Sequence, residues 1–124
     1  MTLNELYNKI GGDYGRAMMV LRIEKLLDKH IRKLPSNPIF AGLEEAGKAM
    51  DGTAIFESAH AIKGVASNLG LVKISDLTAE ICDEFRPGNA RRLSDEELKS
   101  LIKEVGELYK TACDGIKEYE ASQN

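Results

Sequence analysis

Hydrophobic residues recur along this chain at spacings of three and four, which is the period of α-helices that bury one face. No stretch of useful length alternates between apolar and polar positions as a half-buried β-strand does. Alanine, leucine, glutamate and lysine, which favour helix, dominate the composition, and there are only three prolines. The pattern therefore predicts an all-α fold.

The first part of the chain is predicted to form two helices. Thr2 and Glu5 match a capping box, and the short helix that they begin is closed by Gly11 and Gly12. A longer helix is predicted from about 14 to 34, because Pro35 ends it. Its inner face is predicted to consist of Val20, Ile23, Leu27, Ile31 and Leu34.

Four further helices are predicted, with boundaries set by capping residues and helix breakers. Gly70 is predicted to end the second of them with a left-handed turn, and the segment 86–89 to end the third. The third is predicted to bury Leu77, Ile81 and Phe85, and the tail 120–124 to fray. The residues predicted to begin the four helices are Pro38 after Ser36 and Asn37, Asp51 or Thr53, Ser75, and Ser94 with Glu97.

The connections between these helices are short, so that neighbouring helices are expected to run antiparallel. We therefore predict an up-down-up-down four-helix bundle over residues 38–119. The helices of residues 1–35 are predicted to pack onto it as an N-terminal extension. At 124 residues, the whole chain is expected to form a single domain.

One predicted helix carries a polar line opposite its apolar stripe. The stripe consists of Ile55, Ala59, Ile62, Ala66 and Leu69, and the polar line of His60, Lys63, Gly64 and Ser67. His60 is about 160° around the helix from Ile62, so that burying the stripe turns the imidazole outward. We place the candidate function on this line.

The residues of this line suit phosphoryl chemistry. A neutral imidazole is a nucleophile that holds a phosphoryl group as a phosphoramidate, and an unperturbed histidine is largely neutral near pH 7. Lys63, one turn after His60, is expected to neutralise the charged phosphoryl oxygens. Gly64 removes side-chain bulk where a second protein would approach, and Ser67 continues this strip of small residues. Glu57 is a candidate to orient the imidazole ring.

Composition and motifs exclude several other classes of protein. The net charge is −3 with mixed signs, which argues against nucleic-acid binding, and the basic residues Arg86, Arg91 and Arg92 fit a solvated loop. No apolar run is long enough to cross a membrane, and no secretory signal is present, so that we expect a cytoplasmic protein. Cys82 and Cys113 have no metal-ligand spacing and are expected to be free thiols.

The chain also lacks the parts of a self-sufficient enzyme. It has no Gly-rich nucleotide loop, no acidic cluster for magnesium and only two histidines, of which His30 has no second ligand at i+4. If His60 handles phosphoryl groups, another protein must supply the nucleotide or the metal. These features favour a phosphohistidine carrier over an enzyme.

The segment Ala59-His60-Ala61-Ile62-Lys63-Gly64, followed by Asn68-Leu69-Gly70, resembles the histidine-containing phosphotransfer (HPt) domain family. The motif of that family is His-x-Leu-Lys-Gly with a second glycine six residues after the first. The resemblance covers roughly 39–119, and residues 1–35 look like the extension of stand-alone members. The chain departs from the common pattern at Ala61, Ile62 and Leu71.

The resemblance implies a phosphorelay intermediate of a two-component system. His60 would accept a phosphoryl group from an aspartate of a response-regulator receiver domain and pass it on, while Lys63 neutralises its oxygens and Gly64 admits the receiver. The receiver would bring Mg²⁺, and this chain would need no cofactor of its own. A hybrid sensor histidine kinase is a further expected partner, and we expect a monomer.

Three other interpretations remain open from the sequence. His60 and Lys63 are ordinary solvated residues in the first. In the second, the chain is an adaptor that binds receiver or kinase domains without carrying phosphate. The third is an enzyme with a phosphohistidine intermediate, although no residues indicate a substrate pocket.

Overall fold

The structure is a computed structural model, and it describes residues 1–123. These residues contain no β-strand, which confirms the predicted all-α class. The helices are α1 (Leu3–Ile10), α2 (Tyr14–Leu21), α3 (Glu24–Lys33), the 3₁₀ turn η1 (Leu34–Ser36), α4 (Ile39–Ala49), α5 (Gly52–Asn68), α6 (Val72–Phe85) and α7 (Asp95–Ser122).

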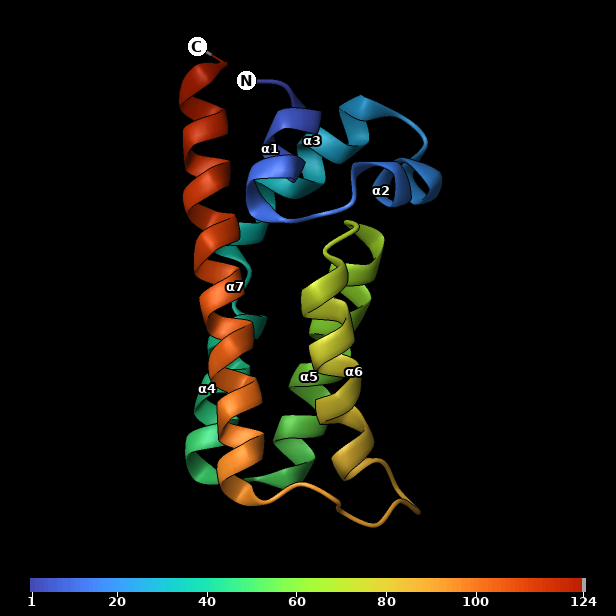
Figure 1. Cartoon of the computed structure of the whole chain (residues 1–124), viewed down its shortest axis with the longest axis vertical. Helices are drawn as coiled ribbons and strands as arrows, with labels where there is room; N and C mark the ends of the chain where they lie inside the picture. The colour runs from blue at the N-terminus through green and yellow to red at the C-terminus, as the bar shows by residue number, and fades with distance from the viewer. Residues whose placement is uncertain (124) are drawn as a thin grey trace.

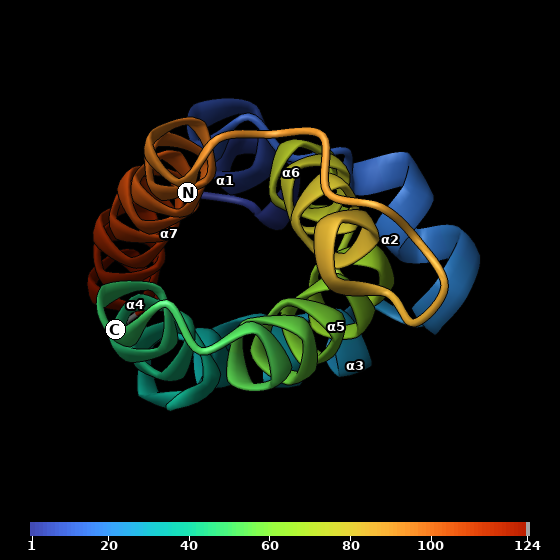
Figure 2. The same cartoon turned by 90° about the horizontal axis from the view of Figure 1, so that it is seen from below.

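Helices α4 to α7 form an antiparallel four-helix bundle, in which each helix packs against the next and α7 returns beside α4 (Figures 1 and 2). Helix α7 is longer than its neighbours and extends past one end of the bundle (Figure 1). The three N-terminal helices cover that end, where α1 and α3 pack against α7 and α2 packs against α5. We call α1, α2 and α3 the N-terminal cap. The division into an extension over 1–35 and a bundle over 38–119 as domain units stays a prediction.

The predicted helix starts are confirmed at three places. Thr2 and Ser94 both form complete capping boxes with the glutamate three residues later. Asp51, rather than Thr53, caps α5, since its carboxylate accepts a hydrogen bond from the backbone N–H of Ala54. These caps satisfy backbone donors that a helix start leaves unpaired, which is why they can be found from sequence.

The predicted long helix from 14 to 34 is wrong, because the chain breaks into α2 and α3. Arg22 ends α2 in the left-handed conformation, with φ of 67°. The break changes the direction of the chain. Residues before and after Arg22 therefore do not share one inner face, as a single helix would require. Val20 and Ile23, which we expected to face inward, are 50% and 57% exposed, whereas Leu27 and Ile31 are fully buried.

The start of α6 also differs from the prediction. The helix begins at Val72, and Ser75 lies inside its first turn rather than capping it. Gly70 adopts the predicted left-handed conformation, with φ of 68°, and delivers the chain directly into α6. The buried side of α6 is centred on Thr78, Ile81 and Cys82, which are fully buried, while the predicted inner residues Leu77 and Phe85 are only partly buried.

The end of the chain is more ordered than predicted. Helix α7 continues to Ser122, and the side-chain amide of Gln123 donates a hydrogen bond to the carbonyl of Met1. The predicted fraying of 120–124 is therefore wrong up to Gln123, and Asn124 lies outside the described residues. Within residues 1–123, no helix is both long enough and apolar enough to pass through a membrane.

Candidate functional site

His60 lies in the middle of α5 and is exposed, as predicted. The opposite side of the same helix is fixed in the core, because Ile55, Ala59 and Ile62 are completely buried. Asp51 at the start of α5 and the left-handed Gly70 after its end fix the limits of the helix. The position of the imidazole on the surface thus follows from the burial of the apolar stripe.

The imidazole of His60 lies parallel to the ring of Phe56, one turn earlier on α5. The two ring centroids are 5.9 Å apart and the planes differ by 9°. The guanidinium carbon of Arg86, at the end of α6, is 5.6 Å from the centroid of the Phe56 ring. Arg86 is held in turn by Asp83, at 3.4 Å. Sequence reasoning missed both Phe56 and Arg86, although the spacing of four between Phe56 and His60 was a usable signal.

Lys63 is half-buried, and its positive charge acts on the thiol of Cys82 in the neighbouring helix α6. The pKa of the Cys82 thiol on α6 depends on nearby charges. Burial raises the pKa of that thiol, while the positive charges of Lys63 and Arg86 act to lower it. The positive charges of Lys63 and Arg86 thus both act on the α6 residue Cys82, and Arg86 also lies over the Phe56 ring that stacks on His60.

Gly64 is exposed, and a Cβ built onto it would meet no atom within 4 Å. Packing within the chain does not require a glycine at this position, which lies in the interior of a helix where glycine costs about 0.5–1 kcal/mol relative to alanine. Gly64 thus leaves an open surface one turn after His60.

Ser67 and Glu57, the other predicted docking residues, are also exposed. The hydroxyl of Ser67 is hydrogen-bonded to that of Ser75, at 2.7 Å, so that it joins α5 to α6. In the described part of the chain no hydrogen bond links the Glu57 carboxylate to the imidazole, which instead stacks on the ring of Phe56. No hydrogen bond among the described residues therefore supports the expected orientation of the imidazole by Glu57.

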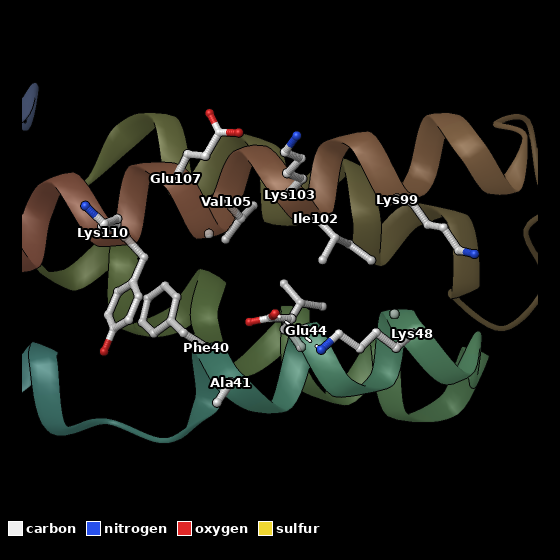
Figure 3. Close-up of a pocket in the computed structure, with 14 residues that line it drawn as sticks. Phe40, Ala41, Glu44, Lys48, Lys99, Ile102, Lys103, Val105, Glu107 and Lys110 are labelled. Carbon is white, nitrogen blue, oxygen red and sulfur yellow. Dashed lines mark ion pairs between the residues drawn. The ribbon is translucent and has the colours of Figure 1, made fainter.

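Other features lie away from His60. His30 is exposed and lines a small hollow of about 250 Å³ together with Val65 and Asn68. Residues 1–123 contain no group of three or more metal-ligating side chains. A larger groove, of about 650 Å³, lies between α4 and α7 (Figure 3). Both cysteines are free thiols.

Comparison with known proteins identifies a domain family. The profile of the Hpt domain matches residues 20–112, a range that contains α3 to α6, most of α7 and the whole His60 surface. No curated protein and no solved structure matches the chain. Since the matched range exceeds half of the chain, and since the fold is the expected helical bundle, this chain belongs to the Hpt domain family, whose members carry out histidine phosphotransfer in phosphorelays.

Proposed function

We propose that this chain is a phosphocarrier, in which His60 accepts a phosphoryl group from the aspartate of a response-regulator receiver domain and passes it to another receiver. A hybrid sensor histidine kinase is the proposed source of phosphate upstream. The observation that carries the proposal is an exposed imidazole, on a helix within the matched range, beside a glycine that leaves space for a second protein.

The proposed step is the direct transfer of one phosphoryl group from the receiver's aspartate to His60. The unprotonated ring nitrogen of His60 attacks the phosphorus of the receiver's aspartyl phosphate. A nitrogen–phosphorus bond forms, the bond from phosphorus to the carboxylate oxygen breaks, and the receiver's carboxylate leaves with the electron pair. The other ring nitrogen keeps its proton, and the reverse sequence delivers the group to the next aspartate.

The neighbouring residues support this step in different ways. The Lys63 ammonium is proposed to neutralise the charge on the equatorial phosphoryl oxygens. Phe56 limits the orientations of the imidazole through the parallel stacking of the two rings. The receiver is proposed to dock over Gly64, Ser67 and Glu57 and to bring its own Mg²⁺.

The proposal is tested by labelling with a phosphorylated receiver domain and Mg²⁺, chosen from a panel of receivers of the same genome. The wild-type chain is expected to take up an acid-labile, base-stable phosphate. His60→Gln is expected to take up none, while its free energy of unfolding changes by no more than ~0.5 kcal/mol because the residue is exposed.

The chain offers a matched control, because it contains only two histidines. His30→Gln removes the other exposed imidazole and is expected to be labelled at the wild-type rate. Receiver binding without any label on the wild type would instead indicate an adaptor. Label that persists in His60→Gln would refute the assignment of His60.

A further inference from the structure

The groove between α4 and α7 has an apolar floor and a charged rim (Figure 3). Gly47 packs so closely on Ile102 that a Cβ at Gly47 would lie 2.9 Å from a methyl group, which brings the two helices together at the floor. At one end the stacked rings of Phe40 and Tyr109, with centroids 3.9 Å apart, close the groove. Between these contacts the groove is open to solvent.

Gly106 lies in the interior of α7 and lines this groove. A Cβ at Gly106 would meet no atom within 4 Å, so that neither close packing nor an unusual backbone conformation accounts for the glycine. The same holds for Gly64 beside His60. Each of these helices thus carries one interior glycine whose effect is to leave an exposed surface free of bulk.

The rim of the groove carries more positive than negative charge, because it contains four lysines and two glutamates, namely Lys48, Lys99, Lys103, Lys110, Glu44 and Glu107. Lys48 is paired with Glu44 and Glu45, at 3.6 and 3.8 Å. Lys110 is paired with Asp114 at 3.4 Å, whereas within residues 1–123 no ion pair engages Lys99 or Lys103. These two lysines are four residues apart on α7, so that they lie one turn apart on the same side of the helix.

We propose that this groove docks an amphipathic helix of a partner protein. Its apolar side would fill the floor, and two carboxylates one turn apart would face Lys99 and Lys103. The stretch of α7 from Lys99 to Lys110 corresponds to about 17 Å at 1.5 Å per residue, which is the length of three helical turns. A linear apolar groove with charges at helical spacing fits a helix-in-groove mode of binding.

The proposed surface is separate from the phosphotransfer site. His60 is on α5 toward α6, whereas the groove is formed by α4 and α7 on the other side of the bundle (Figure 2). The two faces therefore allow a receiver and a second partner to bind at once. The inference does not depend on phosphotransfer by His60.

The test uses two synthetic helical peptides of about 15 residues, a length at which a helix begins to be stable in water. Both carry leucines at i, i+3, i+4 and i+7, and they differ in having glutamate or lysine at two positions one turn apart. Binding is measured by calorimetry and by backbone NMR shifts of the full chain. The acidic peptide is expected to shift the signals of Gly47 and Gly106 but not that of His60.

Variants of the groove have matched controls. Gly106→Leu fills the groove and is expected to weaken binding of the acidic peptide more than tenfold, whereas Gly106→Ala is expected to retain it. Lys99→Glu with Lys103→Glu is expected to weaken it about tenfold, the effect of losing about 1.4 kcal/mol. Lys117→Glu, elsewhere on α7, is expected to have no effect. Labelling of His60 by a receiver is expected to be unchanged in all of these variants.

Three results would overturn the inference. If the acidic peptide binds Gly106→Leu as tightly as it binds the wild type, its binding site lies outside the groove. Equal affinity for the acidic and basic peptides would show that Lys99 and Lys103 do not select the charge of the partner helix. Self-association of the wild-type chain that Gly106→Leu abolishes would assign the groove to a second copy of this chain.

Discussion

Two glycines, one within α5 and one just after it, serve different purposes. Gly64 has open space around it, whereas a Cβ on Gly70 would lie 2.3 Å from the backbone oxygen of Asp13. Gly70 therefore permits the N-terminal cap to approach the bundle, and its φ of 68° also favours glycine. Both were found from sequence as parts of one motif, but only the three-dimensional contacts separate their roles.

A larger residue at Gly64 is expected to affect stability and transfer in opposite directions. Gly64→Gln should raise the free energy of unfolding by about 0.5 kcal/mol, because glutamine favours helix and meets no obstacle. The same change should slow labelling by a receiver about tenfold, as expected if docking loses about 1.4 kcal/mol. Urea unfolding and initial rates of labelling measure the two effects. A variant that is labelled as fast as the wild type would contradict our account of Gly64.

Removal of the Lys63 charge is expected to slow phosphoryl transfer without unfolding the bundle. Lys63→Ala should lower the initial rate of labelling at least about tenfold, since a cation beside developing charge stabilises the transition state. It should also raise the pKa of the Cys82 thiol further, because Lys63 is one of the positive charges that lower it. Lys63→Arg is the control and should recover part of the rate. Unchanged rates in Lys63→Ala would remove Lys63 from the mechanism.

Whole elements were predicted well where the signal is local. The capping boxes at Thr2 and Ser94 depend on residues three apart, and both formed as predicted. The long helix over 14–34 failed because its break at Arg22 has no glycine or proline to mark it. Packing of α2 on α5 and of α3 on α7 selects the break, and these contacts join segments far apart in the chain.

A side chain at Gly70, where α5, α6 and the N-terminal cap meet, is expected to destabilise the protein. Gly70→Ala is expected to lower the free energy of unfolding by about 2 kcal/mol or more, since alanine is strained at positive φ and collides with Asp13. The backbone N–H of Asp13 also donates a hydrogen bond to the Gly70 carbonyl, at 2.8 Å, which the collision would disturb. Urea unfolding measures the free energy of unfolding of Gly70→Ala, with Gly64→Ala as the control. Equal stability of the two variants would contradict it.

At the scale of the whole molecule, the hydroxyl groups of all four tyrosines donate hydrogen bonds that involve the N-terminal cap or the turn η1. Tyr7 donates to the carbonyl of Leu69 and Tyr14 to the carboxylate of Glu24. Tyr109 donates to the carbonyls of Leu34 and Pro35, and Tyr119 to the carboxylate of Asp28. Three of the four tyrosines thus join the cap or η1 to α7 or to the end of α5.

These contacts predict a loss of stability at alkaline pH. Burial raises the pKa of Tyr7, and it raises those of Tyr109 and Tyr119 to about 12, with the bond to Asp28 contributing at Tyr119. The bond to Glu24 raises the pKa of Tyr14. Because folding raises these pKa values above the ordinary 10.0, the stability that they contribute is present below pH 10 and is lost as pH rises toward 12.

Tyrosinate absorbance and circular dichroism, followed together against pH, measure this loss. The absorbance is clean because the chain has no tryptophan. Ionisation of the buried tyrosines is expected above pH 10 together with the loss of helical signal. Ionisation of all four near pH 10 with the helices intact would contradict the prediction.

The all-α class, the helix caps, the exposed side of α5 and the residues that identify the family could all be predicted from the amino-acid sequence. These features depend on helical period and on spacings of a few residues, so that they can be read without knowing what lies nearby in space. Three features followed only from tertiary packing: the break at Arg22, the early start of α6, and the groove between α4 and α7. Each of these arises from contacts between segments that are distant in sequence, where packing outweighs the local preference of the chain.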